Sequence, residues 1–324
     1  MEEREEVIIH SLGERSKENV ILKKKKTNIG GQALLEGILM KGPEKTAIAI
    51  RNKEEIVLKV EPTDSLAAKH KLFSLPFIRG VGILFDSMTK GMKALEYSAS
   101  FDEAYKSEKE EKKKNPILDK LESLLFIIFG LGLALLIFFI LPGLLVDLVR
   151  KGINNRFLEN LLEGLLRIGF FLVYVLLISK QKDIKRVFMY HGAEHKTINC
   201  YEAGEDLTLE NVKKHSRLHP RCGTSFMINL VIIAAIIFSF FNFPNRIVRL
   251  IVRLLAIPLL VGITYELNRW MGRSDSGLSK VLSKAGLWIQ RVATVREPDE
   301  GMIECAILAM NEVIPEDPEA DIWK

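Results

Sequence analysis

The feature that most constrains this chain is an uncharged apolar run at residues 124–146, LLFIIFGLGLALLIFFILPGLLV. A run of about 18 or more apolar residues is typical of a membrane-spanning helix, because roughly 20 residues of helix cross the hydrocarbon core. Residues 226–243 form a second such run. A chain with 27% charged residues must then place its charge outside these segments. The sequence predicts an α-helical multi-pass membrane protein.

Two further apolar stretches carry charges toward their ends, where long side chains can extend to the membrane interface. These are residues 161–179, with Glu163 and Arg167, and residues 250–267, with Arg253 and Glu266. We therefore predict about four transmembrane helices arranged as two hairpins, residues 123–179 and residues 223–268.

The orientation follows from the basic residues near the ends of the predicted spans. Lysines and arginines gather before the first span, at the start of the segment between the hairpins (residues 180–222) and after the last span. Cytoplasmic segments are enriched in these residues. The N-terminal residues are too polar for a secretory signal. We predict a protein of the cell (inner) membrane, with both termini and residues 180–222 in the cytoplasm.

The first 27 residues are polar and predict a disordered basic arm. The arm ends in a run of lysines: Lys23, Lys24, Lys25 and Lys26. Such a run is common where a protein contacts anionic lipid or RNA, which would make the ribosome or the translocon a partner. A solvated flexible arm with no partner is the alternative.

The remaining soluble parts predict a small α+β portion on the cytoplasmic side. In residues 28–122, two alternating runs flank Asn52-Lys53 and indicate a β-hairpin. Residues 65–100 are apolar and punctuated by glycine, which favours a pair of amphipathic helices on the membrane surface, although they could also enter the membrane. Residues 269–324 form a tail in which residues 302–310 suit a short helix.

The segment between the hairpins contains two clusters of potential metal ligands. It begins with YHGAEHKTINCYE, in which His191 and His195 are four residues apart and share one face of a helix. With Glu194 they form H-x-x-E-H, the inverted zincin pattern, in which two histidines bind zinc and the glutamate acts as a base. His191, Glu194 and His195 are therefore candidate site residues.

A second cluster, HSRLHPRCGTSF, follows in the same segment. It offers His219 and Cys222 from a turn, because Pro220 ends any helix at His219. Imidazole and thiolate ligands favour zinc, with iron as the alternative. Four ligands would close a structural site, whereas three ligands and an open position would make a catalytic one. The sequence leaves both open. Cys200 and Cys305 are expected to be packed thiols.

Five motifs, GGQALLEGILMKGP, FIRG, YHGAEHKTINCYE, HPRCGTSF and REPDEGMIECAILAM, occur in this order between residues 28 and 312. Together they resemble the YqhQ-like family of bacterial multi-pass membrane proteins, which is often labelled a putative metal-dependent enzyme. The resemblance supports the membrane fold more than any reaction. The residues in matching motif positions are Gln32, Glu36, Arg79, His191, Glu194, His195, Lys196, His219, Arg221 and Cys222. Glu36 is an additional candidate carboxylate ligand.

Three functions are consistent with these features. The first is a zinc-class metal-dependent membrane enzyme, hydrolytic, with Glu194 as general base at the cytoplasmic face. The second is a non-catalytic membrane factor with a structural metal, which binds a translocon, a ribosome or another membrane protein. The third is a transporter, for which the spans offer few polar residues. The sequence names no substrate.

Overall fold

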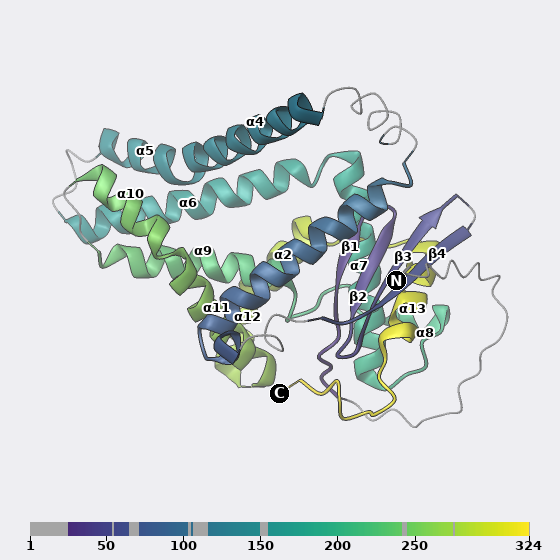
Figure 1. Ribbon diagram of the computed structural model, residues 1–324. Coiled ribbons are helices and arrows are strands. Elements are labelled where there is room, and N and C mark those ends of the chain that lie inside the picture. Colours follow the sequence, from purple (N-terminus) through teal and green to yellow (C-terminus); the bar gives the residue numbers. More distant parts are fainter. Residues whose placement is uncertain are drawn as a thin grey trace.

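The structure, a computed structural model, describes residues 25–53, 55–64, 71–102, 105, 116–149, 155–241, 245–274 and 276–323. It is mostly helical with one antiparallel sheet. Figure 1 shows the long apolar helices gathered at one end of the molecule and the sheet at the other. The predicted disordered arm lies largely outside the described residues, Lys23 and Lys24 included. Lys25 is ordered, with its amine 2.6 Å from Asp321 Oδ1.

The regular elements are as follows. The strands are β1 (Gly30–Leu34), β2 (Gly37–Lys41), β3 (Lys45–Asn52) and β4 (Glu55–Pro62). The helices up to the central segment are η1 (Lys71–Ser74), α2 (Ile78–Ala99), α4 (Pro116–Leu135), η2 (Leu136–Ile140), α5 (Leu141–Val149) and α6 (Arg156–Ile178). The later helices are α7 (Lys182–Ala203), α8 (Leu209–Lys214), α9 (Gly223–Ser239), α10 (Arg246–Leu255), α11 (Ile257–Arg273), α12 (Gly277–Ile289), η4 (Gln290–Thr294) and α13 (Glu300–Val313).

The predicted β-hairpin is present as β3 and β4, and it is half of a larger sheet. The four strands pair in the order β1-β2-β3-β4, all antiparallel. Two of the three turns between paired strands contain Glu36 and Lys53, whose φ angles are 51° and 59°. Strands β1 and β2 come from the glycine-rich segment, where strand propensity is low. They form because both faces of the sheet are covered.

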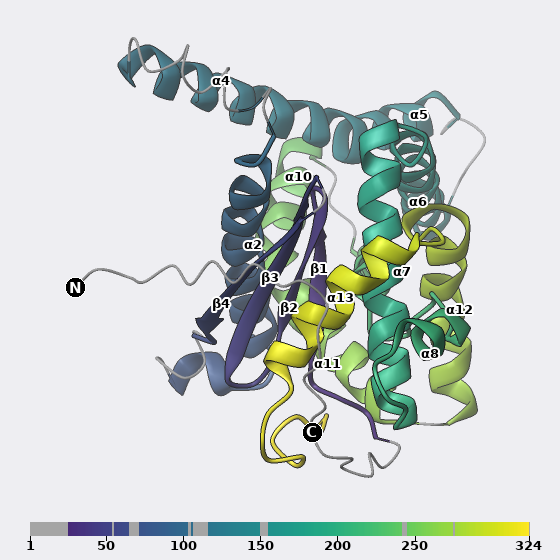
Figure 2. The ribbon, with the colours of Figure 1, turned by 90° about the vertical axis from the view of Figure 1, so that its right-hand side faces the viewer.

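Alternation along the strands divides the core between the two faces of the sheet. Ile38 and Met40 face α7 and α13 in the largest buried cluster, while Leu39 faces α2 in a second cluster. Figure 2 shows α7 and α13 on one side of the sheet and α2 on the other. The sheet therefore holds α2 and α7 on opposite sides of β1.

Residues 78–99 form a single helix, α2, so the predicted helix pair is wrong within the described residues. Only the short η1 precedes α2, and residues 65–70 lie outside the described part. Phe85, Met88 and Met92 remain more than half exposed on α2. The amphipathic character is therefore retained in one helix.

Among the described residues, fewer helices are long and apolar enough to span a membrane than the four predicted. Residues 124–148 and residues 157–178 are long and apolar enough to cross a membrane. A third span results if α10 and α11, which are bent by 43° at their junction, count as one. The apolar helix α9 has 17 residues and is shorter than the other two. These helices indicate association with a membrane.

The charges within the apolar helices pair with one another and do not extend outward. Glu163 is 2% exposed and accepts hydrogen bonds from Arg167 at 2.8 Å and from Arg253 at 3.0 Å. In the same way, Glu266 receives two hydrogen bonds from Arg79. Glu163, Arg167 and Arg253 are buried and pair with one another, so these three do not extend outward as expected, because a buried charge is stabilised by a partner when one is near. The Glu266 side chain is 22% exposed, and its place at the interface stays a prediction.

The segment predicted as a loop at residues 180–222 is largely helical. It consists of α7, the short α8 and a turn that leads into α9. The C-terminal tail contains α12 and α13, and α13 includes the short helix expected at residues 302–310.

Candidate metal centre

Helix α7 carries the first half of the candidate site. Asp183 lies in its first turn, where a carboxylate favours the helix N-terminus, and Gly204 ends it in the left-handed conformation with φ 77°. Between these ends, residues 191, 195, 199 and 202 recur every three to four positions and share one face. The sequence therefore places the histidines and Glu202 in one row.

The turn after α8 brings a sulfur atom to the histidines on α7. Ligand atoms of His191, His195 and Cys222 all lie within 4.8 Å of one another. The Nε2 atom of His191 is 3.1 Å from Cys222 Sγ, and the two histidine rings are 4.4 Å apart between centroids. Two imidazoles and one thiolate in this arrangement can bind one metal ion.

Backbone carbonyl groups orient both histidine rings. The Nδ1 atom of His191 is 2.9 Å from the Thr294 carbonyl oxygen, and that of His195 is 2.7 Å from the Arg217 carbonyl oxygen. A carbonyl oxygen only accepts, so Nδ1 donates in each ring and the lone pair of the neutral ring is on Nε2. Metal-binding histidines commonly have such a partner on the nitrogen that does not bind the ion.

Cys222 immediately precedes α9, whose first turn donates the Thr224 N–H to the sulfur at 3.3 Å. Burial by itself raises the pKa of the Cys222 thiol, but His191 and His195 outweigh it and hold this pKa well below its usual value. Burial likewise opposes charge on His191, yet the adjacent sulfur raises the pKa of this imidazole to about 9. Both shifts favour the thiolate form of the sulfur, which is the form that binds metals.

Glu194 is 5% exposed and points toward β1. Burial raises the pKa of its carboxyl group, although both histidines and a hydrogen bond from the backbone of Gly31 act in the opposite direction. Its Oε2 atom has no hydrogen-bond partner among the described residues. A buried carboxylate oxygen without a partner costs free energy unless something binds there.

The donor set therefore fits a zinc-class ion. Three ligand atoms converge, both histidines are oriented through Nδ1, and one carboxylate oxygen is left for an additional partner. A magnesium ion would require mostly oxygen ligands. The three groups that could hold the metal are His191, His195 and Cys222.

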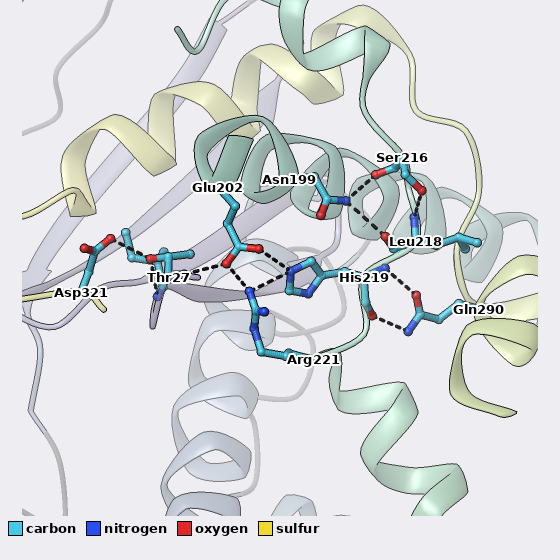
Figure 3. Close-up of polar contacts among 10 residues, drawn as sticks. Thr27, Asn199, Glu202, Ser216, Leu218, His219, Arg221, Gln290 and Asp321 are labelled. Carbon is cyan, nitrogen blue, oxygen red and sulfur yellow. Dashed lines mark hydrogen bonds and ion pairs between the residues drawn. The ribbon is translucent and has the colours of Figure 1, made fainter. Parts of the chain in front are cut away.

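His219, the fourth predicted ligand, lies beside this group but contacts other residues. Figure 3 shows its ring facing both Glu202 and Arg221, which also contact each other. The Nε2 atom of His219 is 3.5 Å from Glu202 Oε2. Arg221 also pairs with Glu202, and Gln290 holds the backbone of His219 through two hydrogen bonds. The His195 and His219 rings are 5.6 Å apart. In this arrangement His219 supports the turn that carries Cys222.

The other predicted residues lie outside the metal ligand group. Glu36 pairs with Arg186 and accepts a hydrogen bond from Tyr190 at 3.3 Å, so it does not serve as a fourth ligand in this structure. Lys196 is buried and lies 2.6 Å from Glu297. Arg79 binds Glu266, and Gln32 packs against Gly91 of α2.

A second group of potential ligands, Cys200, Glu205 and His215, lies near the end of α7. Burial raises the pKa of the Cys200 thiol to about 12, so this sulfur is protonated and a poor ligand. Burial likewise raises the pKa of Cys305 to about 12. These two cysteines are fully buried, consistent with packed thiols.

The sequence patterns missed the residues that connect the site to Thr27 and Asp321, near the two ends of the described part of the chain. Glu202 accepts from the Thr27 backbone at 2.6 Å, and Thr27 donates its hydroxyl to Asp321 at 2.7 Å. Figure 3 shows this line of contacts. The position of Glu202, seven residues after His195 on the same helix face, was a usable signal, whereas Asp321 had none because its contacts are nonlocal.

A comparison with known proteins finds relatives over most of the chain. Residues 75–316 match the family described as "Protein of unknown function (DUF1385)". The chain is 32% identical over 300 residues to "Uncharacterized protein YqhQ" of Bacillus subtilis (strain 168), an alignment that covers 88% of this chain and 92% of that protein. No solved structure matches. The chain belongs to the YqhQ-like DUF1385 family.

Proposed function

We propose that this protein is a zinc-class metal-dependent membrane enzyme that catalyses a hydrolysis at the cytoplasmic membrane surface. The observation that carries the proposal is the combination of three converging ligands with a buried, unpartnered carboxylate oxygen on Glu194. Three protein ligands and an open position are typical of catalytic zinc sites, whereas structural sites use four protein ligands.

The chain's own residues would divide the work as follows. His191, His195 and Cys222 hold the ion, which supplies Lewis acidity and makes water easier to deprotonate when it is bound. Glu194 accepts the proton from the attacking water through Oε2, as its buried position and raised pKa allow. Cys222 lines a cavity of about 690 Å³, which gives a substrate access to the site.

The position of the site in the chain supports a location at one membrane face. Helix α7 starts shortly after the end of α6, and Cys222 immediately precedes α9, so the site lies where both apolar helices terminate. Lys180, Lys182 and Lys185 lie at this end of α6. Basic residues favour the cytoplasmic side. We include in the proposal the original topology of four spans, with α9 as a short span and α10–α11 as a bent one, and with both termini cytoplasmic.

The test uses purified full-length protein and three variants. The wild type should contain about one zinc-class ion per chain by elemental analysis. His191→Ala and Cys222→Ser should each lose it. Glu194→Gln should retain metal and thermal stability but lose function in cells, because the amide cannot accept the proton. Absence of any transition metal from protein prepared without chelator would refute the proposal.

Glu194→Gln also separates this proposal from a purely structural metal. In a non-catalytic factor that binds a ribosome or translocon, the substitution should leave function intact, while His195→Ala should unfold the α7 region because structural zinc contributes to folding. If Glu194 only orients a histidine, its loss would weaken metal affinity about 10–100-fold. Metal affinity and complementation measured together distinguish these three roles.

A further inference from the structure

The cavity beside the candidate metal centre is large enough for a small-molecule ligand. It has a volume of about 690 Å³ and lies between the sheet, α2, the start of α9 and α11. Ligand pockets in proteins span roughly 300–1,000 Å³. Cys222 and Gly31 line this cavity. Cys222 belongs to the candidate metal centre, with its sulfur 3.1 Å from His191 Nε2, and Gly31 lies against Glu194. A ligand in the cavity would thus be adjacent to the site.

The charged side chains on the cavity wall are all basic. Lys41, Lys90, Arg221 and Arg269 line it, and no aspartate or glutamate does so among the described residues. Arg221 is balanced by Glu202. Lys41 and Lys90, however, share the single carboxylate of Asp86, each at 2.9 Å. Two cations with one acid leave an excess positive charge, which favours an anionic group in the cavity.

A second cavity of about 320 Å³ continues along α2. It shares Gln32, Ser87 and Gly91 with the first, and its other walls are Met88, Met92 and Leu95. Methionine side chains are flexible and adapt to apolar chains of varied shape. The two cavities together form a tract. Its basic part lies near Cys222, and its apolar part lies along α2, the helix whose apolar face stays exposed.

We propose that this tract binds an anionic amphiphile, a molecule with a phosphate head group and an acyl-type chain. The phosphate lies in the basic part, near Lys41 and Lys90, and the chain follows Met88 and Met92. The ligand would be the substrate class of the proposed hydrolase, and that part of the inference rests on the proposed function. Binding itself requires no metal, so it can be tested separately.

Alternation along β1 provides a substitution that fills the cavity without disturbing its walls. Gly31 faces Glu194 on α7, so Gly30 and Gln32 face the opposite side, toward α2 and the cavity. A Cβ atom added at Gly30 meets no atom within 4 Å. Gly30→Ile introduces a β-branched side chain that suits a strand. Gly169→Ile is the matched control, because Gly169 is equally open but lies on α6, outside the cavity.

The experiment measures binding to purified full-length protein by native mass spectrometry with three probes: phosphatidylglycerol, phosphatidylcholine and inorganic phosphate. We expect phosphatidylglycerol to bind with higher affinity than phosphatidylcholine. Gly30→Ile should weaken this binding by about tenfold or more, and Lys41→Gln should do the same because a charge-assisted hydrogen bond is lost. Gly169→Ile should bind as the wild type does.

Three results would overturn the proposal: equal binding of the two lipids, unchanged lipid binding in Gly30→Ile, or competition by inorganic phosphate at concentrations as low as those of the lipid. The last result would identify a soluble phosphate compound as the ligand. His191→Ala is included to separate the two proposals. A wild type that contains no metal would refute the hydrolase. Lipid binding that is retained in this metal-free protein and in His191→Ala would still support the lipid site.

Discussion

The adjacent glycines of β1 provide a sharp test of how the candidate centre is packed. Gly31 allows the carboxylate of Glu194 to approach the sheet: a Cβ atom at this position would lie 2.7 Å from the Leu39 carbonyl oxygen and 3.0 Å from Glu194 Cδ and Cγ. At Gly30 the same atom would meet nothing within 4 Å. Alanine at the two positions should therefore have different effects.

The magnitude follows from comparing the two variants. Each Gly→Ala change restricts the unfolded chain to a similar degree, so the stabilising contribution of about 0.4–1 kcal/mol cancels in the difference. What remains is the overlap at Gly31 with a backbone oxygen, and overpacking of this kind costs about 1–3 kcal/mol. A change of 1 kcal/mol shifts the melting temperature by roughly 2–4 °C in proteins of 150–250 residues.

We therefore expect Gly31→Ala to melt roughly 2–12 °C below Gly30→Ala. The assay is differential scanning fluorimetry of both purified variants in one detergent at one scan rate. Gly31→Ala should also bind metal more weakly, because the added methyl group displaces the Glu194 side chain toward the candidate ligands His191 and His195. Equal melting temperatures with equal metal content would refute the packing described for Gly31 and the close approach of Glu194 to β1.

Two more predictions concern cysteine chemistry and topology. At pH 7 in metal-free protein, iodoacetamide should modify Cys222 and spare Cys200 and Cys305, because burial raises the pKa values of the latter two to about 12. Added zinc should protect Cys222 from modification. Mass spectrometry of tryptic peptides reports the labelling of all three cysteines, and equal labelling would contradict the assignment. A cysteine introduced at the exposed Glu205 should be missed by a membrane-impermeant maleimide in intact cells and labelled after lysis, and labelling from outside would reverse the proposed orientation.

Local patterns in the sequence were sufficient for the features that depend on helix geometry. The spacing of His191 and His195 places both on one face of α7, and a turn that ends in Cys222 supplies the third group. These residues are brought together in the structure, while the metal itself remains a prediction. Their ring orientations could not be predicted, because the carbonyl groups of Thr294 and Arg217 approach from distant segments.

His219 shows where such patterns are insufficient. Its sequence context suits a metal ligand. In the structure, however, its ring contacts Glu202, which also pairs with Arg221, and not the ligand atoms of His191, His195 and Cys222. Which partner prevails depends on tertiary distances that no spacing rule contains. Strands β1 and β2 were missed for a related reason. Their glycines have low strand propensity, and Gly31 is required because the Leu39 carbonyl oxygen and Glu194 of α7 lie too close for a Cβ atom.

The walls of the basic cavity come from segments that lie far apart in the chain, which has a consequence for its biosynthesis. Gly31 precedes all the candidate spans, Cys222 separates two of the apolar helices, and Trp323 follows α13. Trp323 is synthesised after all the candidate spans, so this part of the wall is added only once the span sequences have left the ribosome. Under the proposed membrane location, lipid would surround the unfinished cavity until Trp323 is in place, and an amphiphilic ligand would be enclosed as the chain folds.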